Sequence, residues 1–160
     1  MLEEFLQSKE LAEKYKDGCM LLARLAPQDY HRFHFPCECV PKEARLINGF
    51  LFSVNPIAVR RNINILQENK RMITVLQTSK FSEVLYVEIG ATNVGSINQT
   101  FFPNSEYKKG EEKGYFSLGG SCIVLLFEKD KIVFDRDLVG YSSENIETKA
   151  LLGESFAAKR

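Results

Sequence analysis

Apolar residues in the first part of the chain recur with the spacing of an amphipathic helix. Within residues 2–16 they return at roughly three- and four-residue steps, with Glu and Lys between them. The repeating positions are Leu2, Phe5, Leu6, Leu11, Ala12 and Tyr15. Asp17-Gly18 follows, a pair typical of turns. The pattern predicts one N-terminal helix over residues 2–16.

After residue 18 the pattern changes to short apolar runs bounded by turn residues, which is typical of strands. The predicted strands are Cys19–Leu25, Arg45–Val54, Met72–Thr78, Glu83–Ile89, Cys122–Glu128 and Lys131–Phe134. Only Lys129-Asp130 separates the last two, which predicts a tight hairpin. Because little helix lies between the strands, we expect a mainly β fold: a single-domain barrel or sandwich of short strands with an N-terminal helix.

Composition excludes several classes of protein. A length of 160 residues corresponds to about one domain, so we expect residues 1–160 to form a single unit. The 21 Lys and Arg balance the 21 Asp and Glu, which argues against a nucleic-acid partner. The start, MLEEFLQSKE, lacks the apolar core of a secretory signal, and we find no membrane-spanning run. The four cysteines fit a reducing, cytoplasmic setting.

Both histidines of the chain, His31 and His34, lie in one segment that ends at Pro36. Imidazoles can act as general base and general acid near neutral pH, but two structural histidines in a loop explain the spacing about equally well. With Cys37 and Cys39 they make four potential zinc ligands. Structural zinc sites usually space their ligand pairs farther apart, so we expect no metal site.

Glycines are frequent in residues 90–121, which implies backbone that bends or approaches another group closely. The stretch ends in Gly119-Gly120-Ser121, just before a strongly apolar run. A serine-hydrolase elbow needs Gly-x-Ser-x-Gly between a strand and a helix, and this segment lacks it. Taken alone, the segment is a plain turn before a strand.

Several motifs taken together resemble the phosphatidylserine decarboxylase family, the pyruvoyl-dependent enzymes that make phosphatidylethanolamine. In order along the chain they are Arg24–Pro36, Phe52–Ala58 with Glu68–Arg71, Glu88–Ile97, Lys109–Phe116 and Leu118–Ser121. Leu152-Gly153-Glu154 extends the resemblance toward the end of the chain. The resemblance implies a lyase of phospholipid biosynthesis that is made as a zymogen.

The resemblance also assigns roles to individual residues. It implies autocatalytic cleavage between Gly120 and Ser121, giving a β chain of residues 1–120 and an α chain of residues 121–160. The Ser121 hydroxyl attacks the Gly120 carbonyl, and elimination and hydrolysis leave a covalent pyruvoyl group. By similarity His34 is the base for this attack, and His31 serves the decarboxylation step. The pyruvoyl group is the only cofactor implied, an electron sink for the loss of carbon dioxide.

The implied partners are phosphatidylserine and a membrane surface. We expect a peripheral protein at the cytoplasmic face of the cell membrane. The helix at 2–16 is a candidate surface-seeking element, although such an apolar stripe more often packs on a core. By resemblance we also expect a homodimer, or a heterodimer of the two cleavage products.

The chain departs from the family at one catalytic position. Family proenzymes carry an aspartate in an Asp-Gly pair well before the histidine motif, but only 33 residues precede His34 here. Asp17-Gly18 lies too close to be that pair, and Asp29 belongs to the histidine motif itself. Three interpretations stay open: a fragment of a longer proenzyme, one product of a split gene, or a degenerate relative that binds lipid without catalysis.

Overall fold

The centre of the molecule is an antiparallel sheet. The computed structural model describes residues 2–92, 96–117 and 121–160. Six strands form the main sheet in the order β1-β9-β6-β5-β3, and β4 also pairs with β5. Their bounds are β1 Cys19–Leu25, β9 Ser121–Phe127, β6 Ser82–Ile89, β5 Arg71–Thr78, β3 Val40–Pro41 and β4 Arg45–Ile47. Both faces of this sheet are covered, which explains why β6 and β9 are nearly continuous apolar runs.

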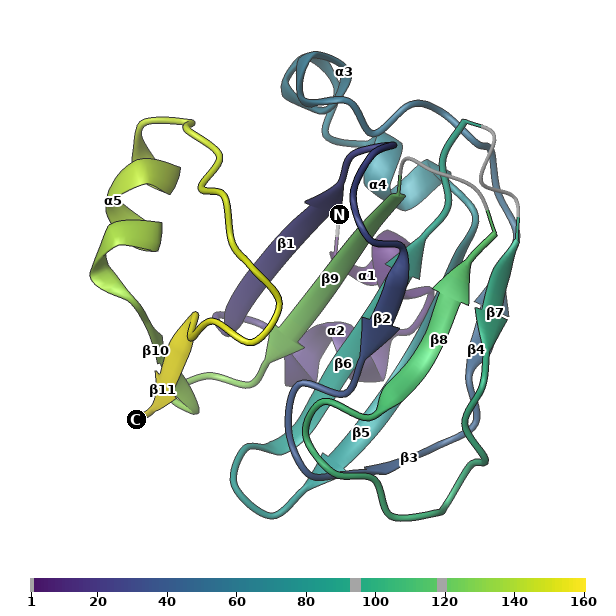
Figure 1. The fold of residues 1–160 in the computed structure, drawn as a ribbon, viewed down its shortest axis with the longest axis vertical. Helices are drawn as coiled ribbons and strands as arrows, with labels where there is room; N and C mark the ends of the chain where they lie inside the picture. The colour runs from purple at the N-terminus through teal and green to yellow at the C-terminus, as the bar shows by residue number, and fades with distance from the viewer. Residues whose placement is uncertain (1, 93–95, 118–120) are drawn as a thin grey trace.

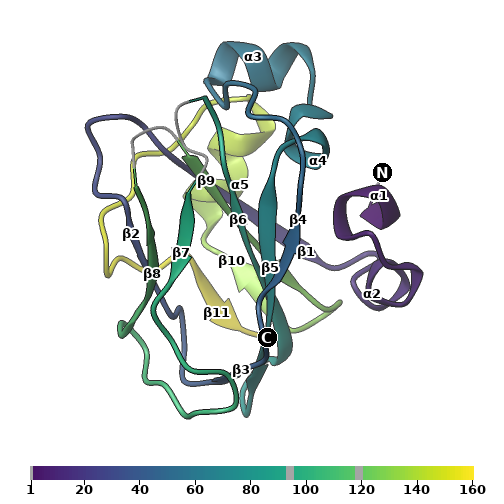
Figure 2. The same ribbon diagram turned by 90° about the vertical axis from the view of Figure 1, so that its right-hand side faces the viewer.

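A second, three-stranded sheet covers one face of the main sheet (Figures 1 and 2). It has the order β2-β8-β7, with β2 Arg32–His34, β8 Glu112–Phe116 and β7 Ile97–Gln99. Aromatic side chains from both sheets, among them Phe33, Tyr86 and Phe116, pack between them, and we call this region the interlayer core. Within this second sheet, Gly114 of β8 permits the close approach of β7, because a Cβ there would lie 2.1 Å from the Asn98 carbonyl oxygen.

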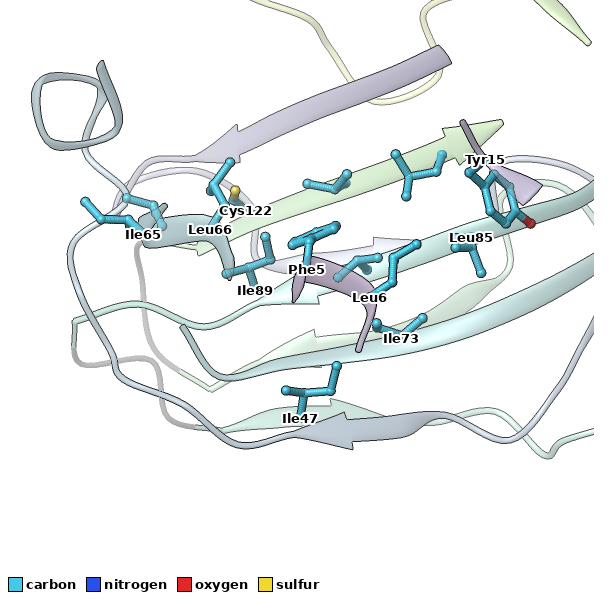
Figure 3. Packing of buried hydrophobic residues seen from close by; sticks show 14 of the residues in the cluster. Phe5, Leu6, Tyr15, Ile47, Ile65, Leu66, Ile73, Leu85, Ile89 and Cys122 are labelled. Carbon is cyan, nitrogen blue, oxygen red and sulfur yellow. The ribbon is translucent and has the colours of Figure 1, made fainter. Parts of the chain in front are cut away.

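Short helices cover the other face: α1 Leu2–Leu6, α2 Lys9–Lys14 and α4 Ile65–Glu68. Figure 3 shows Phe5 and Leu6 packed among the aliphatic side chains of the main sheet. The buried Arg71 guanidinium fastens α1 by donating to the carbonyl oxygens of Phe5 at 2.8 Å and Glu4 at 3.0 Å. The apolar stripe of the N-terminal segment therefore packs on the core.

The prediction of one continuous helix over residues 2–16 is wrong. Gln7 has a φ of 44°, which interrupts the helix after α1. Ser8 then starts α2 as its N-cap, with its hydroxyl accepting from the Leu11 amide at 3.2 Å. The apolar spacing continues across the break because both helices lie on the same face of the sheet.

The predicted fold class is confirmed as mainly β with helix at the N-terminus, in the form of a layered sandwich. Among the described strands the main sheet stays open between β1 and β3, so it is not a closed barrel. The strand predicted over Arg45–Val54 is shorter than expected: β4 ends at Ile47, and the chain leaves the sheet toward α3, Pro56–Arg61.

The predicted hairpin across Lys129-Asp130 is also wrong. Both edges of β9 are occupied, by β1 and by β6, so no edge is free for the next strand. Instead β10, Ile132–Phe134, pairs with β11, Ala157–Lys159, beyond helix α5, Arg136–Ser143. None of the helices in the described ranges has the length and apolar character needed to span a bilayer.

Candidate functional site

Ser121 lies at the start of the central strand β9. It pairs with Leu25 of β1, and the next residue, Cys122, pairs with Ile89 of β6. Because strand side chains alternate, Ser121 faces the same side as Leu125 and Phe127, which is the interlayer core. Ser121 is fully buried, and its Oγ has no hydrogen-bond partner among the described residues. Gly120, the other half of the predicted cleavage site, lies outside the described residues.

His31 comes just before β2, and its carbonyl oxygen accepts from the Phe116 amide at 3.0 Å. Phe33 and Phe35 follow at alternate positions and are buried in the interlayer core, so the strand alternation, if continued back by one residue from β2, would place His31 on that side. Its Nε2 lies 3.3 Å from the Pro27 carbonyl oxygen, which can only accept. In the neutral form of the ring, this contact puts the proton on Nε2 and the lone pair on Nδ1. That Nδ1 is buried and has no partner among the described residues.

His34 lies on the opposite face of β2, and both of its ring nitrogens are occupied. Nδ1 donates to the Gly110 carbonyl oxygen at 2.9 Å, and Nε2 lies 3.0 Å from the Tyr30 hydroxyl. The imidazole also stacks on the Tyr30 ring, with centroids 5.7 Å apart. These contacts hold the ring of His34 without bringing it to Ser121.

The start of β2 and the start of β9 lie at the same end of the molecule (Figures 1 and 2). The end of β8 joins them, since Phe116 binds the backbone of His31 and only residues 117–120 separate it from Ser121. Buried polar atoms without partners are uncommon in folded proteins. Two of them, Ser121 Oγ and His31 Nδ1, lie at this end of the molecule and are not hydrogen-bonded to each other. A hydroxyl and an imidazole nitrogen are the groups needed for nucleophilic attack.

Of the two aspartates considered from the sequence, Asp17 lies at the far end of the main sheet, whereas Asp29 lies two residues before His31. Asp17 lies in a turn with a φ of 58°, just before the point where Cys19 pairs with Phe127. Ser121 is six positions along β9 from Phe127, about 20 Å away at ~3.3 Å per residue. The Asp29 carboxylate is used locally, accepting from the Ala26 amide at 2.7 Å.

Three of the cysteines, Cys37, Cys39 and Cys122, are neutral thiols packed among other side chains. Burial raises the pKa of Cys37 to about 11 and the pKa of Cys39 to about 12. Burial raises the pKa of Cys122 to about 12 as well, so it behaves as a small apolar residue of the core. In the described part of the chain no three His, Cys, Asp or Glu side chains are placed to hold a metal ion.

Sequence reasoning missed a buried ion pair that links the two sheets. Lys113 of β8 and Glu88 of β6 are both fully buried, with Nζ 2.5 Å from Oε1. The ammonium also binds Thr74 Oγ1 at 2.9 Å and Gln99 Oε1 at 2.7 Å. It lies 4.8–5.6 Å from the ring centroids of Phe33, Tyr86 and Phe101. No local pattern marks this pair, because its members lie 25 positions apart in the chain.

Burial shifts the pKa values of both Glu88 and Lys113 toward their uncharged forms. Burial is the largest influence on each, raising the pKa of the Glu88 carboxyl and lowering the pKa of the Lys113 ammonium. Their mutual attraction opposes both shifts. The pair therefore depends on its complete set of contacts, since either charge alone would be costly in this core.

Comparison with known proteins places these features in a family context. The family description "Phosphatidylserine decarboxylase" matches residues 1–158. A phosphatidylserine decarboxylase proenzyme of Chlamydia trachomatis is 52% identical over 158 residues, covering 99% of this chain and 52% of the relative. The proenzyme of Chlamydia pneumoniae is 53% identical over 154 residues, covering 96% of this chain and 51% of the relative. The chain thus spans about half the length of the curated relatives it matches.

Proposed function

The chain belongs to the phosphatidylserine decarboxylase family, and we propose that it decarboxylates phosphatidylserine to phosphatidylethanolamine with a pyruvoyl group made from its own Ser121. The observation that carries the proposal is the buried Ser121 hydroxyl, which has no hydrogen-bond partner among the described residues. An unpartnered hydroxyl costs stability, so its retention beside a glycine pair favours a chemical role.

Self-cleavage would proceed by an acyl shift followed by elimination. The Ser121 Oγ bonds to the carbonyl carbon of Gly120 as its proton passes to a base. The C–N bond then breaks, leaving an ester and the Ser121 amine. A base removes the Cα proton of residue 121, and Gly120 departs as a carboxylate. Water replaces the nitrogen of the resulting dehydroalanine, ammonia leaves, and residue 121 ends as a pyruvoyl group.

His31 is the imidazole best placed to receive the first proton. The resemblance assigned that role to His34 and the decarboxylation step to His31, and both assignments remain untested. Strand alternation puts His31 on the Ser121 side of β2, with a free lone pair on Nδ1. His34 faces away, and both its nitrogens are engaged. The geometry therefore favours His31 as the base for self-cleavage.

The residues present fit a pyruvoyl group at position 121, because Ser121 Oγ already occupies a buried site with no competing partner. When formed, the group supplies a carbonyl that accepts the electrons released as carbon dioxide leaves. The His31 imidazole, on the same side of β2, can then hold or return a proton there.

We further propose that the cleavage products 1–120 and 121–160 stay together. Residues 121–127 form the central strand β9, which is hydrogen-bonded to β1 on one edge and β6 on the other. Both partners belong to the 1–120 product, so the cut chain keeps its sheet. It would act as a heterodimer of its own products at the cytoplasmic face of the membrane that holds its substrate.

The test is intact mass spectrometry of the purified chain beside its Ser121→Ala variant. We expect two products, 1–120 and 121–160, from the unsubstituted chain and one uncut chain of 18.3 kDa from the variant. Equal cutting of both proteins would show that another residue or a contaminating protease is responsible. An unsubstituted chain that stays whole would refute self-processing.

A further inference from the structure

Large apolar side chains are exposed together in the segment between β4 and α4. Measured as exposed fractions, they are Phe50 63%, Leu51 38%, Phe52 43%, Ile57 65% and Ile63 48%. Phe50 and Phe52 stack on each other, with ring centroids 4.9 Å apart. We call residues 50–63 the apolar ridge. In Figures 1 and 2 its helix α3 projects at one end of the molecule.

Backbone contacts hold the apolar ridge in this exposed position. The Phe50 amide donates to the Glu68 carbonyl oxygen at 2.9 Å, and its own carbonyl accepts from the Lys70 amide at 2.8 Å. The Phe52 amide donates to Asn69 Oδ1 at 2.9 Å. The aromatic side chains therefore face outward on an anchored backbone, and their exposure is a property of the fold.

The charge of this segment is of one sign. Between residues 44 and 67 the chain carries Arg45, Arg60 and Arg61 and no Asp or Glu. Arg60 and Arg61 form the last turn of α3, beside the exposed Ile57. Arg61 is exposed, while the Arg60 guanidinium donates to the Asn145 carbonyl oxygen at 2.6 Å. Glu68, the next carboxylate along the chain, is half-buried and lines a small pocket together with Phe52. The Glu147 carboxylate lies close enough to Arg60 for that guanidinium to help lower its pKa.

A second surface also exposes apolar side chains but carries mainly negative charge. Exposed apolar side chains alone therefore do not identify the membrane-docking surface. The exposed side chains of the second surface include Val139, Tyr141 and Leu151 in the C-terminal part of the chain. Residues 137–154 carry four carboxylates against one lysine. Anionic lipid would repel that surface, whereas it attracts the arginines of the apolar ridge.

The apolar ridge is tied to the strand end that borders Ser121. Asn69 Nδ2 donates to the carbonyl oxygens of both Phe52 and Gly90 at 2.8 Å. Thr92 Oγ1 donates to the Leu51 carbonyl oxygen at 3.1 Å. Gly90 directly follows Ile89, the residue paired with Cys122. A surface that contacts the apolar ridge is thereby held next to the start of β9.

We propose that the apolar ridge docks the protein on a bilayer of anionic lipid, inserting Phe50, Phe52 and Ile57 between headgroups. This inference rests on the proposed function, since it places the lipid surface beside residue 121, whose pyruvoyl group is to react with a lipid headgroup. Aromatic and aliphatic side chains flanked by arginine are the composition of interfacial membrane-binding segments. The N-terminal helices cannot serve this purpose, because Phe5 and Leu6 are buried.

The test is co-sedimentation of the purified chain with vesicles of phosphatidylcholine alone or mixed with phosphatidylserine. Phe50→Ser/Ile57→Ser should weaken binding to the mixed vesicles about tenfold or more, because two side chains lose apolar burial. The matched control Val139→Ser/Leu151→Ser, at similarly exposed positions of the acidic surface, should bind within about twofold of the unsubstituted chain. Arg61→Gln should cost about fivefold on mixed vesicles and nothing on neutral ones.

Several outcomes would overturn the docking surface. They are an unsubstituted chain that binds neither vesicle, equal binding by Phe50→Ser/Ile57→Ser, and a larger loss in the control. A dimer in solution that Phe50→Ser/Ile57→Ser dissociates, without vesicle binding, would assign the apolar ridge to a protein contact. Ser121→Ala should bind vesicles normally, so failure of self-cleavage and failure of docking are separate results.

Discussion

Two neighbouring sites differ in whether their buried polar groups have hydrogen-bond partners. Glu88 pairs with Ile123, two positions along β9 from Ser121, so the two sites lie about 7–8 Å apart on one face of the sheet. At the first, the Lys113 ammonium has three oxygen partners. At the second, Ser121 Oγ and His31 Nδ1 have none among the described residues.

Under the proposed function, this difference separates the polar groups that stabilise the fold from those that take part in chemistry. A core that surrounds a buried ammonium with a carboxylate, a hydroxyl and an amide can satisfy polar groups well. The unpaired hydroxyl next to it is therefore a local exception. We infer that the Glu88–Lys113 site fixes the two sheets, while the Ser121–His31 site stays unpaired so that it can react.

The largest expected effect separates the two histidines. His31→Ala should slow self-cleavage by about 10²–10⁴-fold, the usual contribution of a general base, because the Nδ1 lone pair is lost. His34→Ala should slow it less than tenfold, since its nitrogens are held by Tyr30 and Gly110. The measurement is a time course of the 121–160 product by mass spectrometry. The reverse order of effects would return the base to His34.

The next largest effect concerns the buried Glu88–Lys113 ion pair. Lys113→Met should lower the free energy of unfolding by about 3–5 kcal/mol, because it leaves the Glu88 carboxylate buried without its counter-charge. Urea denaturation measures the loss. The double variant Glu88→Gln/Lys113→Met, which buries no charge, should recover most of it. A loss below about 1 kcal/mol in the single variant would mean that water reaches the pair and that the two sites do not differ as described.

A smaller effect of opposite sign is expected at the reactive site. Ser121→Ala should leave the free energy of unfolding unchanged or raise it by up to about 1 kcal/mol, because it removes a buried hydroxyl that has no partner. The comparison uses the uncut form of each protein, with Thr74→Ala as the control. That variant takes one partner from Lys113 and should destabilise. A marked loss of stability in Ser121→Ala would reveal a hydrogen bond at Oγ.

The smallest effect comes from an ion pair at the surface, which sets the scale for the buried one. The Lys14 ammonium beside Glu83 lowers the pKa of that carboxyl. Stability from this pair is therefore present above the ordinary carboxyl pKa of about 4.3 and is lost as pH falls through the lowered value. Lys14→Met should cost about 0.5 kcal/mol at neutral pH, allowing for solvent screening, and nothing in strong acid. A cost that persists in acid would point to lost packing instead of charge.

The long apolar runs made much of the main sheet predictable. The predicted strand Cys19–Leu25 coincides with β1, and the strand predicted over Glu83–Ile89 lies within β6. The predictions of the N-terminal helix and of the last hairpin were wrong because the backbone path at these places is not determined by the apolar spacing. A positive φ at Gln7 breaks the helix. Both edges of β9 are already paired, so β10 pairs with β11 instead.

The candidate site was predictable in its residues but not in its arrangement. His31, His34 and Ser121 were named from motifs. The strand β2, Arg32–His34, has only three residues, which is too short to show the alternation of apolar and polar positions that would place the two imidazoles. The Glu88–Lys113 pair and the apolar ridge depend on which side chains the sheets bring together or leave exposed. Neither follows from residue spacing along the chain.

The most direct test of the central claim is the chemical nature of residue 121 after cleavage. We predict that the product 121–160 is lighter, by the mass of one ammonia, than a peptide with an N-terminal serine. We also predict that it resists N-terminal sequencing and reacts with a hydrazine at its new carbonyl. A product of the same length that begins with a free serine amine would contradict the account, since simple hydrolysis would then have cut the chain.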